Sequence, residues 1–433
     1  METSTSLRQV AAGAPPESVR AHRHLVALAL LFSLFFLWGV ANNLNDILIR
    51  QFKKAFELTD FQSGLVQSAF YLGYFLFALP AALFLRWRGY KAGIVLGLSL
   101  YAAGALLFYP AANARGYGFF LLALFVIASG LSFLETSANP YVTLLGPAHS
   151  AERRLNFAQA FNPLGSITGV LIGRLFIFSG NEYTPEQLAG MSTAARDAYY
   201  AAESVAVQQP YLIIGLVVGL LALVFKLTPF PAAGSGHESP GAGLLQGFRS
   251  LAGNRNFVVA VLAQFFYVGA QVGIWSYSIR YAQGTIPGTA EKTAADYLIV
   301  SLVVFMIGRF AGTALMKAVA PARLLAMYAL INALLSGVAM LVPGHIGLWA
   351  LIATSFFMSI MFPTIFALGL RGVGDARELA SSFLVMAIIG GAILTPFMGA
   401  ISGQLGIQWS IAVPLLAFVV VLGFAISNRS AEA

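Results

Sequence analysis

The chain has 433 residues, of which 58% are hydrophobic and only 10% are charged. Soluble domains carry about 25% charged residues, so this composition excludes an ordinary water-soluble enzyme or binding domain. The net charge of +8 is spread singly or in pairs between long apolar runs, which excludes a nucleic-acid-binding surface. The chain has no cysteine, which excludes disulfides, thiolate metal sites and thiol catalysis. No motif of a known catalytic or nucleotide-binding site occurs in a suitable context, so we expect no enzymatic activity, no catalytic residue and no metal site.

The apolar runs predict an all-α membrane protein with about twelve transmembrane helices. A spanning helix needs about 20 predominantly apolar residues. Runs of this kind occur at 25–49, 61–85, 92–112, 118–144, 155–178, 210–228, 257–280, 295–317, 322–342, 345–370, 380–402 and 408–427. The first run lacks a small-residue cleavage site, and we expect it to be a retained helix rather than a signal peptide.

Two segments between these runs are too polar for a bilayer. Residues 179–209 carry acids and tyrosines, and residues 229–256 are rich in Pro, Gly and Ser. The second segment is the natural linker between two halves. We therefore predict a six-helix half at 1–228, a cytoplasmic linker at 229–256 and a second six-helix half at 257–433.

The positive charges in the loops predict the orientation. With the N-terminus placed inside, the inner segments hold 16 Lys and Arg residues and the outer loops hold 7. Cytoplasmic loops of membrane proteins carry the excess of Lys and Arg. The count favours both termini in the cytoplasm, although Arg50, Lys53 and Lys54 in the first outer loop oppose it.

An internal repeat supports the two halves. FFLWGVANNLNDILIR at 35–50 and FFYVGAQVGIWSYSIR at 265–280 share Phe-Phe, Gly and Ile-Arg at a constant offset of 230 residues. Asn139-Pro140 and Phe362-Pro363 repeat at an offset of 223. Parallel halves related by an axis along the membrane normal are the layout of major-facilitator transporters, which bind substrate between the halves.

Four ionisable residues fall inside the predicted spans, where each is costly: Asp46, Glu135, Arg174 and Arg309. Asp46 and Glu135 are candidate proton acceptors facing a water-filled cavity. The alternatives are an interfacial position for Asp46 and a static ion pair with a buried arginine for Glu135. Arg174 lies near a helix end and can reach the interface. The sequence names no partner for Arg309.

Amides and indole rings form a second polar signal. Asn156, Gln159 and Asn162 follow one another at helical spacing and share nearly one face. The other candidates are Gln264, Gln271, Trp275 and Tyr277 on the seventh run, and Trp38 and Asn43 on the first. Amides bond hydroxyl groups and aromatic faces cover the C–H face of a sugar ring, so the group suits a neutral polyol. Hydrogen bonds that only hold helices together are the alternative for each single amide.

Seven motifs resemble the fucose-permease family of the major facilitator superfamily, which also includes glucose/galactose and N-acetylglucosamine permeases. They are SLFFLWGVANNLNDILIRQF (33–52), FQSGLVQSAFYLGYF (61–75), LETSANPYVTLLGP (134–147), RLNFAQAFN (154–162), LAQFFYVGAQVGIWSYSIRYA (262–282), MIGRFAGT (306–313) and PTIFALG (363–369). Together they cover nearly the whole chain.

The resemblance implies proton-coupled uptake of a hexose or 6-deoxyhexose by alternating access. It implies that Asp46 and Glu135 are the proton-linked carboxyl groups, and that Asn43 and Gln159 contact the sugar. The chain departs from the fucose permease at Met361-Phe362, where the relative has Gln-Tyr, and at Pro163, where it has Ser. Both departures lie on helices expected to line the cavity, so fucose itself is in question while a sugar is not.

We thus expect a monomeric, multi-pass sugar transporter of the bacterial inner membrane, with the lipid bilayer as its surroundings and the proton as coupling ion instead of a cofactor. Sodium in place of the proton stays open. An antiporter or facilitator for another metabolite or a drug is the alternative within the same fold. A membrane sensor is an alternative from another class, and it would be expected to carry a soluble signalling domain.

Overall fold

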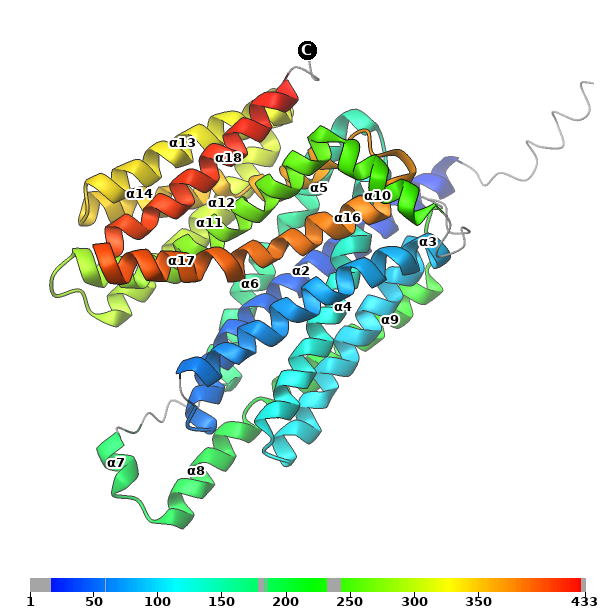
Figure 1. Ribbon diagram of the computed structural model, residues 1–433. Coiled ribbons are helices and arrows are strands. Elements are labelled where there is room, and N and C mark those ends of the chain that lie inside the picture. The colour runs from blue at the N-terminus through cyan, green and yellow to red at the C-terminus, as the bar shows by residue number, and fades with distance from the viewer. Residues whose placement is uncertain (1–16, 59, 178–182, 184, 232–242, 430–433) are drawn as a thin grey trace, which may run out of the picture.

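The computed structural model describes residues 17–58, 60–177, 183, 185–231 and 243–429, and every regular element in these ranges is helical (Figure 1). It contains 11 helical segments long and apolar enough to cross a membrane. One of them, Leu65–Asn113, has 49 residues, which is far more than one crossing requires. It belongs to α3 (Asp60–Asn113), whose helix is interrupted at Gly89, where φ is +79° and favours glycine. One crossing before Gly89 and one after it bring the total to twelve, so the prediction of about twelve transmembrane helices is confirmed.

The first half of the chain forms one group of packed helices. Its members are α2 (Glu17–Ala55), α3, α4 (Tyr117–Leu144), α5 (Ala151–Gln159) continuing into α6 (Phe161–Ile172) and a π-helical turn (Gly173–Ile177), and α9 (Gln208–Leu227). The polar segment predicted at 179–209 contains α7 (Pro185–Ala189) and α8 (Thr193–Val205), which extend from the bundle in Figure 1.

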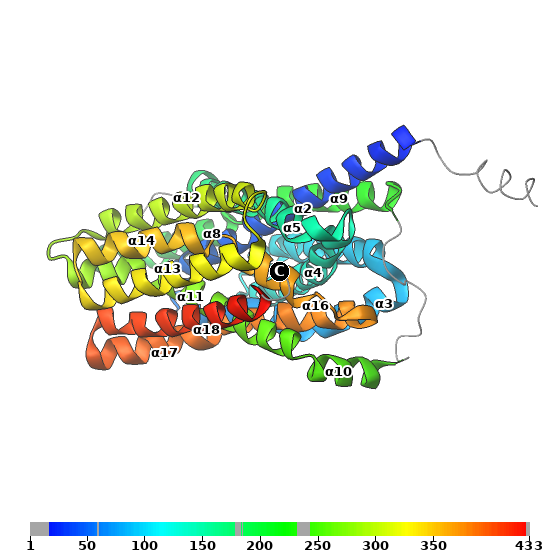
Figure 2. The same ribbon diagram turned by 90° about the horizontal axis from the view of Figure 1, so that it is seen from above.

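The second half forms the other group, which Figure 2 shows beside the first. Its helices are α11 (Arg255–Thr285), α12 (Glu291–Leu315), α13 (Pro321–Leu341), α14 (His345–Met358) continuing into α15 (Met361–Gly369), α16 (Arg377–Met386) continuing into α17 (Gly390–Leu405), and α18 (Ala412–Arg429). The linker predicted at 229–256 is described only in part, and its described part holds α10 (Leu244–Gly253). Domain boundaries at residues 228 and 257 stay a prediction.

The internal repeat marks equivalent helix contacts in the two groups. α2 packs against α6, and α11 packs against α17. A Cβ atom on Gly39 would clash with the backbone oxygen of Asn162, and one on the repeated Gly269 would clash with the side chain of Leu394. Small residues allow such close approach of membrane helices. Gly39 and Gly269, which are 230 residues apart, therefore serve the same packing role in the two groups.

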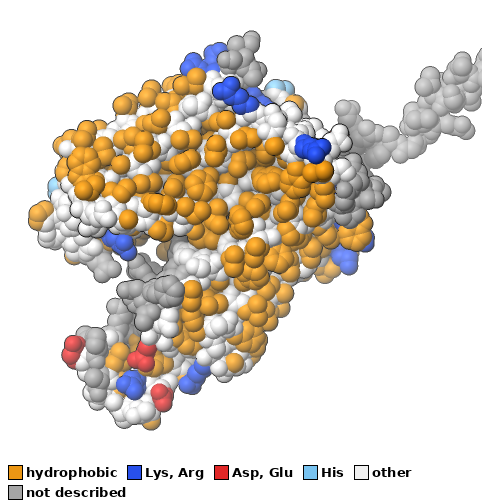
Figure 3. Space-filling model, in the orientation of Figure 1, with side chains coloured by type: hydrophobic (Ala, Val, Ile, Leu, Met, Phe, Trp, Pro, Cys, Tyr) orange, Lys and Arg blue, Asp and Glu red, His pale blue; other side chains and the backbone are white. Residues whose placement is uncertain are grey.

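The outer surface is that of a membrane protein. Figure 3 shows hydrophobic side chains over much of the visible face, with Lys and Arg toward its edges. Leu175, Leu220 and Leu334 are each more than 60% exposed, which water would penalise and lipid does not. The chain is thus a multi-pass membrane protein.

Among the described residues, the two groups meet closely at one end. We call this the closed end; it contains α10 and the turns η1 (Ala148–Ser150) and η3 (Gly374–Ala376), and there α3, α4 and α5 contact α15 and α16. The opposite end, called the open end, carries α7, α8 and the α11–α12 connection. Figure 3 shows the surface hollowed between the two groups.

Candidate functional site

A cavity of about 310 Å³ lies between the two groups of helices. α2, α3, α4, α5 and α6 form one wall, and α11, α12 and α15 contribute to the other. The lining contains amides from both groups, eight aromatic rings and two oppositely charged residues, Glu135 and Arg309. A cavity that offers amides and ring faces together suits a neutral solute with both hydroxyl and C–H surfaces.

Most of the side chains that the sequence singled out reach this cavity. Those that line it are Trp38, Asn43, Glu135, Gln159, Asn162, Gln271 and Trp275. Gln264 does not line it and is fully buried in α11, and Asn156 is likewise fully buried away from it. Asp46 belongs to α2 and Arg174 to the π-helical turn, but both side chains lie outside the described part of the structure. The roles of these residues stay predictions.

Hydrogen bonds fix the two indole rings on opposite walls. Trp38 Nε1 donates to Tyr74 Oη at 2.6 Å, and the Trp38 ring stacks on Phe35 with centroids 5.5 Å apart. Trp275 Nε1 donates to Ser355 Oγ at 3.2 Å, and its ring meets the edge of Phe305 at 5.0 Å. With their N–H groups satisfied, neither ring offers a donor to a ligand. Trp275 is partly exposed, whereas Trp38 is 2% exposed.

Gln159 connects three helices at the bottom of the cavity. Its Nε2 donates to Asn139 Oδ1 on α4 at 3.0 Å, and its Oε1 accepts from Arg309 Nη1 on α12 at 3.4 Å. Asn43, in contrast, donates within α2, to the Gly39 carbonyl at 3.3 Å, and to no other described residue. Gln159 is therefore held in place, and a substitution there disturbs its neighbours.

Arg309, whose partner the sequence could not name, binds two backbone carbonyls that prolines leave free. Its Nη1 donates to the Gln159 carbonyl at 3.1 Å, and its Nε donates to the Ser359 carbonyl. In a helix each of these carbonyls would accept from the residue four positions later, but those residues are Pro163 and Pro363, which have no N–H. Its guanidinium also lies 4.7 Å from the Phe305 ring centre. The buried guanidinium is thus stabilised by carbonyl dipoles, one from each group of helices.

Glu135 is the cavity carboxyl group. It is 8% exposed, and its Oε2 has no hydrogen-bond partner within the described residues. None of the described Lys or Arg side chains forms an ion pair with it, so the alternative of a static buried ion pair finds no support there. A buried carboxylate without a cation is costly, which makes this group suited to binding a proton.

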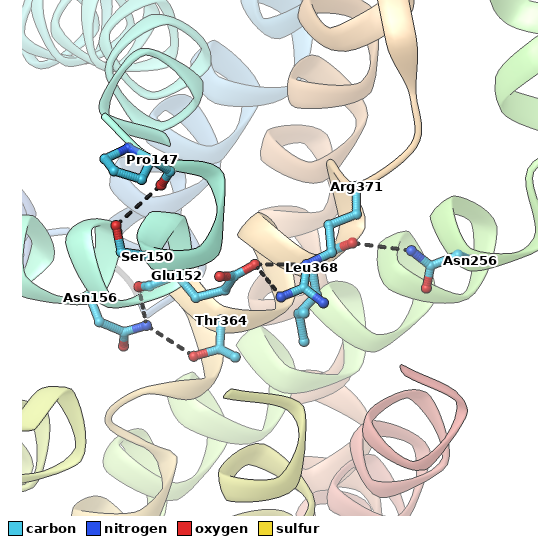
Figure 4. Close-up of polar contacts among 8 residues, drawn as sticks. All are labelled: Pro147, Ser150, Glu152, Asn156, Asn256, Thr364, Leu368 and Arg371. Carbon is cyan, nitrogen blue, oxygen red and sulfur yellow. Dashed lines mark hydrogen bonds and ion pairs between the residues drawn. The ribbon is translucent and has the colours of Figure 1, made fainter. Parts of the chain in front are cut away.

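Polar bonds between the two groups close the floor below the cavity (Figure 4). Glu152 on α5 accepts from Arg371, which follows α15, at 2.8 Å, and Asn156 Nδ2 donates to Thr364 Oγ1 at 3.0 Å. Tyr90 Oη donates to Glu378 Oε1 on α16 at 3.0 Å. The sequence did not single out Glu152 and Glu378, because both stand at helix ends next to arginines and look like solvent-exposed residues.

Two six-helix groups around a central polar cavity define the general architecture of a membrane solute transporter. Residues 26–387 match the family model described as Major Facilitator Superfamily. The L-fucose-proton symporter of Escherichia coli (strain K12) is 48% identical over 94% of both chains. The glucose/galactose transporter of Brucella abortus is 38% identical over 90% of this chain and 91% of the relative.

Solved structures of transporters are similar to this chain as well. The crystal structure of the transporter FucP in the outward conformation superposes with a TM-score of 0.88, at 48% identity, over 94% of this chain and 99% of that one. The proton:xylose symporter XylE shares the fold, with a TM-score of 0.63 at 14% identity. The chain belongs to the major facilitator superfamily, and within it to the family of the L-fucose-proton symporters. Its relatives are transporters and not enzymes.

Proposed function

We propose that this chain takes up a hexose or 6-deoxyhexose together with protons, by alternating access. One observation carries the proposal: Glu135, a carboxyl group without an ion-pair partner among the described side chains, shares one cavity with several amides and with fixed aromatic rings. The names of the relatives, L-fucose-proton symporters and glucose/galactose transporters, agree with it. The proton is the coupling ion, and no other cofactor is needed.

The cavity chemistry supports a sugar. Its volume of about 310 Å³ falls at the small end of small-molecule pockets, which range from about 300 to 1,000 Å³. Gln159, Asn162 and Asn43 on one wall and Gln271 on the other can bond hydroxyl groups from two sides. The face of the partly exposed Trp275 can cover a C–H surface of the ring, and Trp38 lines the opposite wall. One chain supplies both walls, so we propose the monomer as the functional unit.

Protonation of Glu135 would couple the proton to the sugar. A bare carboxylate resists enclosure when the cavity closes, whereas the neutral acid does not. The loaded carrier would therefore change conformation with the proton bound, and the empty carrier would release the proton to return. The resemblance assigns Asp46 a role in the same relay, and this role is part of the proposal.

We further propose that the closed end faces the cytoplasm of a bacterium and that both termini lie there, in the inner membrane. The loop count of 16 against 7 Lys and Arg supports this orientation. The structure would then be the outward-facing state, as in the similar FucP structure. A reporter fused within α8 should behave as periplasmic and one within α10 as cytoplasmic. The same location for both reporters would contradict the twelve-helix map.

Transport by the purified protein in liposomes tests the proposed function. Labelled L-fucose, D-galactose and D-glucose are supplied with an imposed inward proton gradient, without a gradient, and with a sodium gradient instead. We expect one of these sugars to accumulate only with the proton gradient. Accumulation with sodium alone would reassign the coupling ion, and no accumulation of any sugar would favour the antiporter or facilitator for another metabolite.

A further inference from the structure

A second layer of amides lies below the cavity, one helical turn closer to the closed end. On α4, Asn139 follows the cavity residue Glu135 by four positions, and on α5, Asn156 precedes Gln159 by three. On α11, Gln264 precedes Val268, which lines the cavity, by four. Because α4 ends and α5 and α11 begin at the closed end, all three steps lead in the same direction. We call Asn139, Asn156 and Gln264 the inner amide layer.

The inner amide layer is completely buried, yet its hydrogen bonds are incomplete. All three side chains are 0% exposed. Neither amide atom of Gln264 has a partner within the described ranges, and the same holds for Nδ2 of Asn139 and Oδ1 of Asn156. Buried polar groups in stable proteins are normally paired, and each unpaired one costs free energy. An amide that served only to hold helices together would be bonded to a neighbour, whereas neither amide atom of Gln264 is bonded within the described residues.

The unpaired atoms offer both donors and acceptors. Asn139 presents an N–H group, Asn156 a carbonyl oxygen, and Gln264 one of each. A hydroxyl group both donates and accepts, so this set matches a polyol or water and lacks the charge that an ion would require. Gln264 also lies on the same face of α11 as the cavity residues Gln271 and Trp275, so one helix face leads from the cavity to the inner amide layer.

The bonds around this layer are those that must break when the closed end opens. Asn156 donates to Thr364 of the other group at 3.0 Å, and the Glu152–Arg371 contact lies one further turn toward the closed end (Figure 4). We expect separation of α5 from α15 to expose the inner amide layer to the aqueous side. It would also free one of the two N–H groups of Asn156 Nδ2, while the other stays bonded to the Glu152 carbonyl at 2.9 Å.

We propose that the inner amide layer is a second sugar subsite, which binds the hydroxyl groups of the transported sugar after the closed end has opened and before release. The subsite rests on the proposed function, because it binds the same sugar. In the state described here it is occluded, and its unpaired amides favour opening. Gln264 is its main contact, since both of its amide atoms are available.

The absence of cysteine gives a direct test, because a single introduced thiol has no background. Gln264→Cys is prepared in inside-out vesicles and treated with a membrane-impermeant thiol reagent, with and without the sugar that the wild type transports. We expect the thiol to react from this side, and saturating sugar to slow the reaction several-fold. Lys317→Cys, exposed at the closed end, should react fully, and Gln283→Cys, exposed at the open end of α11, should not react.

A second variant covers the case in which the thiol variant does not fold. Gln264→Met keeps the side-chain length and removes both polar atoms. We expect unchanged sugar affinity from the open-end side and several-fold weaker affinity from the closed-end side, measured as uptake in right-side-out and inside-out vesicles. Gln283→Met on the same helix is the matched control and should change neither affinity.

The outcomes separate the subsite from the proposed function. The subsite alone would be overturned if the wild type transports sugar but the Gln264→Cys thiol never reacts. The same conclusion would follow if the thiol reacts at the same rate with and without sugar. Equal loss of affinity on both sides in Gln264→Met would place Gln264 in the central cavity and also overturn it. Absence of transport of any sugar by the wild type would overturn the proposed function and the subsite together.

Discussion

Oε1 of Glu152 accepts from both Nε and Nη2 of Arg371 at 2.8 Å, and this joins the two groups of helices at the closed end. The Glu152 side chain is 2% exposed and that of Arg371 is 37% exposed. The pair has no counterpart at the open end within the described ranges, where the groups make few contacts. It therefore favours the state in which the closed end is shut.

Arg371→Gln should shift the conformational equilibrium toward opening of the closed end. Hydrogen bonds to charged groups contribute about 1.5–3 kcal/mol, but the partial exposure of Arg371 reduces this to about 1 kcal/mol, or about a fivefold shift. Spin labels on cysteines at Lys226 and Lys317, which are exposed on opposite groups, would report it as a larger population of long distances. Arg323→Gln, exposed at the start of α13, is the control. An unchanged distance distribution would mean that the pair does not hold the groups together.

Gln159→Ala should weaken sugar binding more than Asn43→Ala. Loss of one neutral hydrogen bond to the sugar costs about 0.5–1.5 kcal/mol, which is several-fold in affinity. Gln159→Ala additionally leaves Asn139 Oδ1 without its donor and removes one acceptor from Arg309, whereas the bond of Asn43 among the described residues stays within its own helix. Quenching of tryptophan fluorescence by the sugar would measure the affinity. Gln208→Ala, outside the cavity, should bind like the wild type, and wild-type affinity in both test variants would assign these amides to helix packing.

Glu135→Gln should separate sugar exchange from sugar accumulation. Glutamine resembles the protonated acid in shape and charge but cannot release a proton. The variant should therefore exchange labelled sugar in counterflow and fail to concentrate it under a proton gradient. Glu57→Gln, an exposed carboxyl group, should retain both activities. Wild-type accumulation by Glu135→Gln would exclude Glu135 as the coupling group, and equal loss of exchange and accumulation would indicate a structural or sugar-holding role. Asp46→Asn is expected to show the same pattern if the two acids act as a relay.

Phe362→Tyr should change the preference among sugars. Phe362 lines the cavity, while its neighbour Met361 is fully buried and does not. Of the two departures from the Gln-Tyr of the fucose-permease pattern, only the lost hydroxyl group can thus face the substrate directly. The added hydroxyl should raise the affinity for L-fucose relative to D-glucose by several-fold, in line with about 0.5–1.5 kcal/mol for one hydrogen bond. Competition between the two labelled sugars would measure the ratio, with Phe357→Tyr as control, and an unchanged ratio would remove Phe362 from the determinants of specificity.

The sequence was sufficient for the spans and for most of the cavity. Apolar runs of spanning length reveal the helices, and an amide such as Gln159 stands out against them. Depth along a helix was harder to predict: Gln264, Gln271 and Trp275 share one face, but helical periodicity does not say where the cavity ends. Gln264 consequently was expected in the cavity and lies below it.

The partners of buried charges were missed because they lie far away in the chain. The bond from Glu152 to Arg371 spans 219 residues, and only the packing of the two groups reveals it. The two carbonyls that Arg309 binds do carry a local signal, although neither carbonyl is near Arg309 in the chain. A proline inside a helix frees the carbonyl four residues earlier, and Pro163 and Pro363 identify the two carbonyls that this arginine binds.

The glycine contacts between α2 and α6 constrain how the sugar can bias the transport cycle. A Cβ on Gly39 would clash with the Asn162 backbone, and one on Gly165 would clash with the Phe36 backbone, so these helices touch main chain to main chain and are expected to move as one body. A ligand shifts a conformational equilibrium only by the difference between its affinities for the two states. Asn43 and Asn162, carried on this one body, would hold the sugar equally well in both states and set how tightly it binds. Trp275 and Phe362, on the opposite wall, would then decide which state the bound sugar prefers.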